Sequence, residues 1–138
     1  MYSIAKISAA EALQLINSVI VDAEKMGKAV VVAVCGPEGE LISFLRMDEA
    51  GPASTVIARN KAYTAARDRQ ATKGMGMWMR SSNTPPSFWG DDMITGFGGG
   101  VPIVANGKVI GAVGVSGLTE DEDEHLAKSA IVLCGYTC

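Results

Sequence analysis

Two β-hairpin patterns constrain the fold of this chain more than any other feature. Residues 29–35 (AVVVAVC) are rich in β-branched valine without polar alternation, which predicts a strand buried on both faces. A Gly-Pro-Glu-Gly turn then leads into residues 40–47, which predict the returning strand. Residues 101–105 and 109–116 flank an Asn-Gly pair, the strongest short hairpin signal. Strands in adjacent pairs favour an antiparallel sheet over a Rossmann-type sheet.

Helical patterns surround the two hairpins. Ser8 and Glu11 form a capping box for a helix that ends near Gly27. Ser54 is the candidate N-cap of a second helix that continues to about residue 71, and a last helix covers about 121–135. The positions expected to face the core are Ala12, Leu13, Ile16, Val19, Ile20 and Ala23 in the first helix, and Val56, Ala62, Tyr63 and Ala66 in the second. The chain is therefore expected to be one α+β domain over residues 1–138.

Residues 72–100 differ in composition from the rest of the chain. They are rich in Gly, Met, Ser and Pro and hold both tryptophans, which predicts short helical turns and loops with a functional or interfacial role. The apolar set that includes Met77 and Trp78 favours a subunit interface, and a flat hydrophobic cofactor is the alternative. Six basic residues and one acid lie between Arg59 and Arg80. They predict either a solvated helix face or an anion site for carboxylates or haem propionates.

Charge and cysteine content limit the class of protein. The formal net charge of −3 argues against non-specific nucleic-acid binding, which needs a basic surface. Residues 1–7 lack the pattern of a secretion signal, and the apolar run 29–35 is too short to cross a bilayer, so we expect a cytoplasmic protein without a membrane span. Three cysteines without a CxxC pair predict free thiols, with Cys35 and Cys134 buried.

Several polar residues are candidates for a site. Arg46 and Asp48 lie at a strand end and Lys61 on the next helix, so Asp48 is expected to form a salt bridge with Lys61 or Arg46, or part of a polar binding site. We also expect Asp48, Lys61 and the loop at 99–100 to line one pocket. A nucleotide-binding role for the glycine cluster is disfavoured, because the glycines lead into a strand and Pro102 lacks an N–H. His125 follows an acidic run, which favours a solvated helix start, although one ring nitrogen could ligate a haem iron.

Taken together, these motifs resemble the GlcG/HbpS-type haem-binding family, which also supplies the C-terminal domain of PduO-type cobalamin adenosyltransferases. The segments that carry the resemblance are residues 33–39, 46–50, 57–65, 99–102 and 107–117. The resemblance implies a profilin-like α/β/α sandwich with a five-stranded antiparallel sheet, the fifth strand coming from residues 2–7 or from the long loop. It also implies homo-oligomers built from dimers and haem as a possible cofactor. Cys35 stands where the family usually has aspartate, and His125 matches no motif position.

The favoured function is a small-ligand or tetrapyrrole-binding accessory protein of a metabolic pathway such as glycolate or diol/glycerol utilisation. One alternative is an enzyme acting on a small hydroxy or carbonyl compound, with Asp48, Lys61, Cys35 and His125 as candidate groups. The other is a structural oligomer that assists a partner enzyme. The candidate ligand-binding residues are Arg46, Asp48, Lys61, Met77, Trp78, Arg80, Gly99, Gly100 and Pro102, with Met77 and His125 as weak candidates for an iron ligand.

Overall fold

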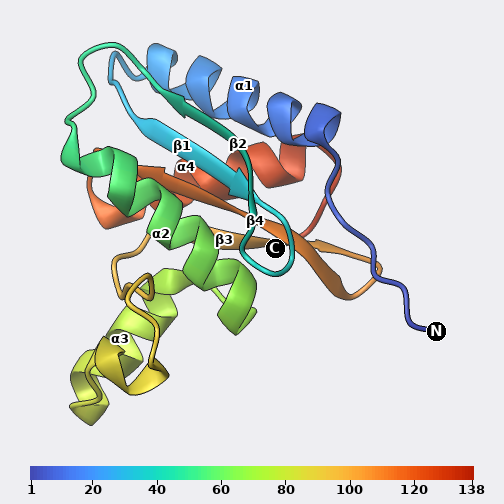
Figure 1. Cartoon of the computed structure of the whole chain (residues 1–138). Coiled ribbons are helices and arrows are strands. Elements are labelled where there is room, and N and C mark those ends of the chain that lie inside the picture. Colours follow the sequence, from blue (N-terminus) through green and yellow to red (C-terminus); the bar gives the residue numbers. More distant parts are fainter.

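The computed structural model describes all 138 residues and shows three layers around one antiparallel sheet (Figure 1). The strands are β1 (Val31–Cys35), β2 (Leu41–Arg46), β3 (Gly100–Ala105) and β4 (Lys108–Ser116), in the order β2-β1-β4-β3. The helices are α1 (Ala9–Lys25), α2 (Ala53–Asp68), α3 (Thr72–Ser82), the 3-10 turn η1 (Pro86–Trp89) and α4 (Glu120–Leu133). Helices α1 and α4 cover one face of the sheet, α2 covers the other, and α3 projects beyond the sheet.

The sheet has four strands, so the expectation of a five-stranded sheet is wrong, while the α/β sandwich class is right. Residues 1–6 are exposed, and Ile7 alone is buried from this segment, where it donates its N–H to the Ile110 carbonyl at 2.9 Å. This one bond to the sheet fixes the start of α1, but a single bonded residue does not make a strand. The long segment between α3 and β3 supplies no strand either.

Helix α1 begins at its predicted cap, whereas α2 already begins at Ala53 after Pro52, so the N-cap predicted at Ser54 is wrong. The Ser8–Glu11 capping box is present, and Ser8 Oγ accepts from the Glu11 N–H at 3.1 Å. Leu15 takes the core position expected for Leu13, which is 54% exposed, and Val56 is exposed as well. Most of the other expected inner positions are confirmed, since Ala12, Ile16, Val19 and Ala23 of α1 are buried, as are Ala62 and Ala66 of α2.

At two positions another part of the backbone lies so close that only glycine fits. These glycines occur in a strand and a helix, where they weaken a prediction of secondary structure from the sequence. Gly114 of β4 faces α2, where a Cβ would collide with the carbonyl of Ala58, so this glycine lets the helix lie directly on the sheet. Gly76 lies in the middle of α3, an 11-residue helix in a segment expected to be loops and short turns. A Cβ there would collide with the carbonyl of Gly96. No helix is both long and apolar enough to cross a membrane.

Candidate functional site

The largest pocket lies between α3 and the segment that returns from it to the sheet. Its volume is about 660 Å³ and it is open to solvent. The Gly76–Gly96 contact brings helix and segment together at its base. The lining residues are Gly76, Met79, Arg80, Asn83, Thr84, Pro85, Pro86, Ile94, Thr95, Gly96 and Phe97. Of the residues predicted to bind a ligand, Arg80 alone is in this set.

The pocket combines an apolar wall with one unpaired cation. Met79 and Ile94 are buried and form a small apolar cluster with Met75, and Phe97 is exposed at the pocket. Arg80 has neither a carboxylate within salt-bridge distance nor a hydrogen bond, and no acid lines the pocket. In a chain with a net charge of −3, this pocket is a place where an anionic group is favoured next to apolar surface.

The segment 83–97, part of which lines the pocket, is hydrogen-bonded to α2. Tyr63 Oη donates to Asp91 Oδ2 at 2.6 Å, and the Arg67 guanidinium lies 5.0 Å from the centre of the Tyr63 ring. The next residue of α2 makes a second bond, since Thr64 Oγ1 accepts from the Thr95 N–H at 3.0 Å. The Tyr63 hydrogen bond lowers the pKa of Asp91 and raises the pKa of Tyr63, because it stabilises the carboxylate and holds the phenol proton. The hydrogen bond from Tyr63 to Asp91 therefore holds this segment against α2 and favours the ionised form of Asp91.

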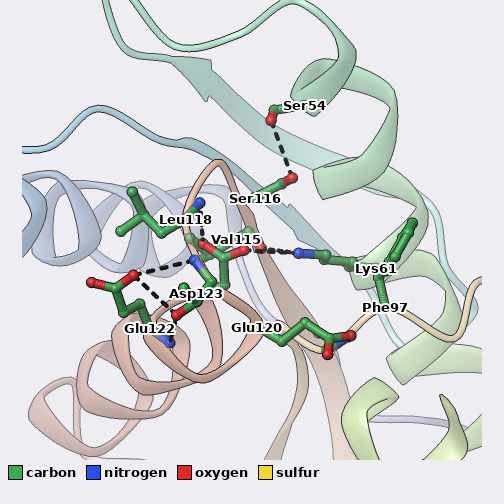
Figure 2. Close-up of polar contacts among 12 residues, drawn as sticks. Ser54, Lys61, Phe97, Val115, Ser116, Leu118, Glu120, Glu122 and Asp123 are labelled. Atoms are coloured by element: carbon green, nitrogen blue, oxygen red, sulfur yellow. Dashed lines mark hydrogen bonds and ion pairs between the residues drawn. The ribbon is translucent and has the colours of Figure 1, made fainter.

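A second polar cluster lies inside the protein (Figure 2). Lys61 Nζ is 3.0 Å from Asp123 Oδ2, and both side chains are only 3% exposed. Lys61 also donates to the Val115 carbonyl at 2.8 Å, and Asp123 Oδ1 accepts from the Leu118 N–H at 3.1 Å. Burial raises the pKa of Asp123, and the Lys61 ammonium opposes that rise. The pair ties α2 to the end of β4 and the start of α4.

The glycine loop closes over this buried pair. Gly99 has a φ of +125°, and a Cβ there would lie 2.9 Å from Lys61 Nζ and 2.6 Å from the Val115 carbonyl oxygen. Gly100 likewise has no room for a side chain, since a Cβ would collide with the Lys61 carbonyl. The structure therefore brings together Lys61, Gly99 and Gly100. They are in direct contact, and no space for even a methyl group is left between them.

Other predicted site residues lie apart from the buried Lys61–Asp123 pair. Asp48 is exposed in the turn after β2 and bonds neither Lys61 nor Arg46, so the predicted salt bridge is wrong. Arg46 instead donates to the Ala50 carbonyl at 3.0 and 2.8 Å, because the chain turns back after β2. Pro102 is buried in β3 opposite Ala112.

The remaining candidates are surface residues or an unreactive thiol. Met77 and Trp78 are exposed on α3 without lining the large pocket, and His125 is exposed on α4. Cys35 is buried, as expected, and its thiol donates to the Ala62 carbonyl at 3.2 Å. Burial raises the pKa of Cys35 to about 12, so the sulfur is a neutral thiol rather than a nucleophile.

Asp123 was missed, whereas Met79 was counted in the apolar set of the long segment but not among the candidate ligand-binding residues. Asp123 was grouped with the solvated acids at the start of α4, yet it shares the spacing of the buried Leu126, Ala127 and Ala130 at i+3, i+4 and i+7. That helical periodicity could have identified it as the acid facing inward. Met79 stands four residues after the buried Met75, and the same periodicity would have placed it on the inner side of α3.

Known proteins resemble this chain over most of its length. The family model described as haem degrading protein HbpS-like matches residues 7–132. An uncharacterized 15.0 kDa protein from the dhaT-dhaS intergenic region of Citrobacter freundii is 38% identical over 130 residues, covering 93% of this chain and 92% of that protein. Protein GlcG of Escherichia coli (strain K12) is 40% identical over 95 residues, 69% of each chain.

Among solved structures, the PduOC:heme complex is similar with a TM-score of 0.89 and 25% identity, covering 96% of this chain and 97% of that one. The match to the family model and the identity to the relatives agree with the resemblance seen in the sequence motifs. The chain belongs to the HbpS-like family.

Proposed function

We propose that this protein binds haem or a related tetrapyrrole in the pocket between α3 and residues 83–97, as an accessory protein of a metabolic pathway. The observation that carries the proposal is the unpaired Arg80 guanidinium beside an apolar pocket without an acid. Membership of the HbpS-like family and the similarity to a haem complex support the choice of ligand.

The residues of the pocket fit the chemistry of haem. The volume of about 660 Å³ lies within the range of roughly 300–1,000 Å³ that is usual for small-molecule and cofactor sites. Met79, Ile94 and Phe97 offer apolar surface to a porphyrin ring, and Arg80 offers a cation to a propionate. The Met79 thioether is a possible iron ligand, whereas Met77 and His125 do not line the pocket. Bound haem would supply iron-centred redox chemistry, and the chain's part is to bind and orient it.

The alternative enzymatic function has weaker support in the geometry. Of its four candidate groups, Lys61 is paired inside the protein, Cys35 is a buried neutral thiol, and Asp48 and His125 are exposed outside the large pocket. The pathway assignment, glycolate or diol utilisation, rests on the similarity to protein GlcG and to the corrinoid adenosyltransferase PduO of Citrobacter freundii. The latter is 27% identical over 125 residues, and the chain spans 36% of its length.

Haemin titration with matched variants tests this function. Wild type is expected to keep a Soret band through gel filtration. Arg80→Ala should weaken binding about tenfold, since a hydrogen bond to a charged group is worth roughly 1.5–3 kcal/mol and partial exposure reduces this. Arg59→Ala, another exposed and unpaired arginine, is the control and should bind like wild type.

Three further variants identify the iron ligand. Met79→Leu should shift the Soret band, whereas Met77→Leu and His125→Ala should leave it unchanged. If wild type binds haemin no more tightly than an unrelated protein with an apolar patch, the haem proposal fails. If all variants match wild type, haem binds at another site.

A further inference from the structure

A second pocket, smaller than the one beside Arg80, is lined by both tryptophans of the chain. Its volume is about 350 Å³, and it lies where the end of α2, helix α3 and the turn η1 meet. Gly76 and Arg80 of the larger pocket lie on a different face of α3, so the two pockets are separate. The residues that line the smaller pocket, which we name the tryptophan corner, are Gln70, Met75, Trp78 and Trp89.

The two indole rings form the walls of this corner. The ring centres of Trp78 and Trp89 are 6.1 Å apart, and their planes make an angle of 88°. A flat ligand can stack on only one of two perpendicular rings, whereas a compact tetrahedral group can contact both. The half-buried Trp89 ring is held in place, because its Nε1 donates to Asp68 Oδ1 at 3.4 Å. The arrangement therefore favours a compact ligand over a flat one.

Asp68 gives the corner a negative charge that no side chain of the protein neutralises. Its carboxylate accepts hydrogen bonds from the Trp89 indole and the Gln70 amide, which are both neutral donors. It takes part in no salt bridge. An indole whose N–H donates to a carboxylate is also more electron-rich, which strengthens the attraction of its face for a cation.

The basic residues close to this corner in the sequence are engaged elsewhere. Arg67 lies 3.7 Å from Asp91, and Lys73 lies 2.5 Å from Asp121. Arg69 donates to a backbone carbonyl of β4. No charged residue lines the corner itself. The corner therefore offers aromatic surface beside an acid without a counter-ion, the reverse of the larger pocket with its unpaired cation.

We propose that the tryptophan corner binds a small alkylated ammonium ion. Its positive charge lies against the indole faces and within the field of Asp68, and its alkyl groups contact Met75 and the rings. A cation over the face of tryptophan is attracted by the ring quadrupole, and aromatic walls recognise quaternary ammonium groups in this way. The volume of about 350 Å³ is near the lower end of the roughly 300–1,000 Å³ usual for ligand sites, which favours a small molecule.

Tryptophan fluorescence tests this site with choline as the probe. Because the chain has two tryptophans and both line the corner, any change in their emission reports on it. Choline chloride should change the emission in a saturable way beyond the effect of equal sodium chloride. The compound 3,3-dimethylbutanol has the shape of choline without its charge, and should bind about tenfold more weakly. An equal response to the two compounds, or no response to choline beyond that of sodium chloride, would overturn the proposal.

Paired variants separate the charge from the rings. Asp68→Asn should weaken choline binding about threefold, as expected for a partly exposed charge, and Asp92→Asn, at an exposed acid without a bonded partner, is its control. Trp78→Leu should weaken choline binding at least tenfold with Trp89 as the reporter. Met77→Leu is its control, since Met77 is exposed on α3 outside the corner.

Both control variants should bind choline like wild type, and the circular dichroism of all four should be unchanged, because Trp78 is 53% exposed. Equal weakening by Asp68→Asn and Asp92→Asn, or wild-type binding by Trp78→Leu, would contradict the proposal.

NMR signals locate the bound ligand. Choline should shift both indole N–H signals and the amide signal of Gln70, while the amide signals of Asn83 and Phe97, in the larger pocket, stay in place. The largest shifts at Asn83 and Phe97 would place choline in the larger pocket and overturn the assignment to the tryptophan corner.

Discussion

Lys61 and Arg80 are both cations from the basic stretch of the sequence, and the structure uses them in opposite ways. Lys61 is buried against Asp123 and the Val115 carbonyl, and Gly99 closes over its ammonium group. Arg80 is exposed, has no bonded partner and lines the large pocket. The difference shows that a charged side chain beside a glycine loop links elements of the fold when its counter-ion is buried with it. It is available to a ligand only when no partner is present.

The largest loss of stability is expected from a substitution in the buried Lys61–Asp123 pair. Lys61→Met leaves the Asp123 carboxylate buried without its counter-ion, which costs about 3–5 kcal/mol in the free energy of unfolding. The double variant Lys61→Met/Asp123→Leu removes both charges and should recover much of this loss. Urea denaturation of the three proteins measures both effects. A single variant as stable as wild type would show that Lys61 does not link α2 to α4.

The glycine loop is the next test. Gly99→Ala should destabilise the protein by about 3 kcal/mol, since its Cβ would approach the Val115 carbonyl oxygen and the backbone is left-handed. Gly107→Ala is the matched control, because Gly107 also has a positive φ but open space around it, and it should cost about 1 kcal/mol. Equal shifts in thermal midpoint for the two variants would mean that the loop does not close tightly over Lys61.

Much of the fold could be predicted from short-range signals. The capping box of α1 and both hairpins depend on local chemistry, and all are present. The partner of Lys61 could not be found this way, because Asp123 is 62 residues away and the acidic run around it is typical of an exposed helix start. Helix α3 was missed for a related reason, since Gly76 opposes helix formation locally and is explained only by its contact with Gly96.

A smaller loss of stability is expected when the bond between α2 and the segment 83–97 is removed. Tyr63→Phe removes the hydroxyl that donates to Asp91, and should cost about 1 kcal/mol at pH 7. The pKa of Asp91 is lowered in the folded state, so this contribution is present above the unfolded pKa of about 3.9 and is lost as the pH falls through the folded value. The stability difference from wild type should therefore vanish in acid.

Chemical denaturation between pH 7 and pH 2.5 measures this dependence. Tyr2→Phe, which alters an exposed tyrosine without a bonded partner, is the control and should match wild type at every pH. A Tyr63→Phe deficit that stays constant down to pH 2.5 would show that the ionised form of Asp91 does not hold the segment 83–97 against α2.

The central claim is that the ligand binds beside Arg80 and not at the buried Lys61–Asp123 pair, and paramagnetic NMR tests it most directly. Haemin, whose iron is paramagnetic, should broaden the amide signals of Gly76, Arg80, Thr95 and Gly96, which line the large pocket. The signals of Lys61, Gly99 and Gly100, which form the buried cluster, should stay sharper. Strongest broadening at Gly99 and Gly100, or on α4 around His125, would contradict the account.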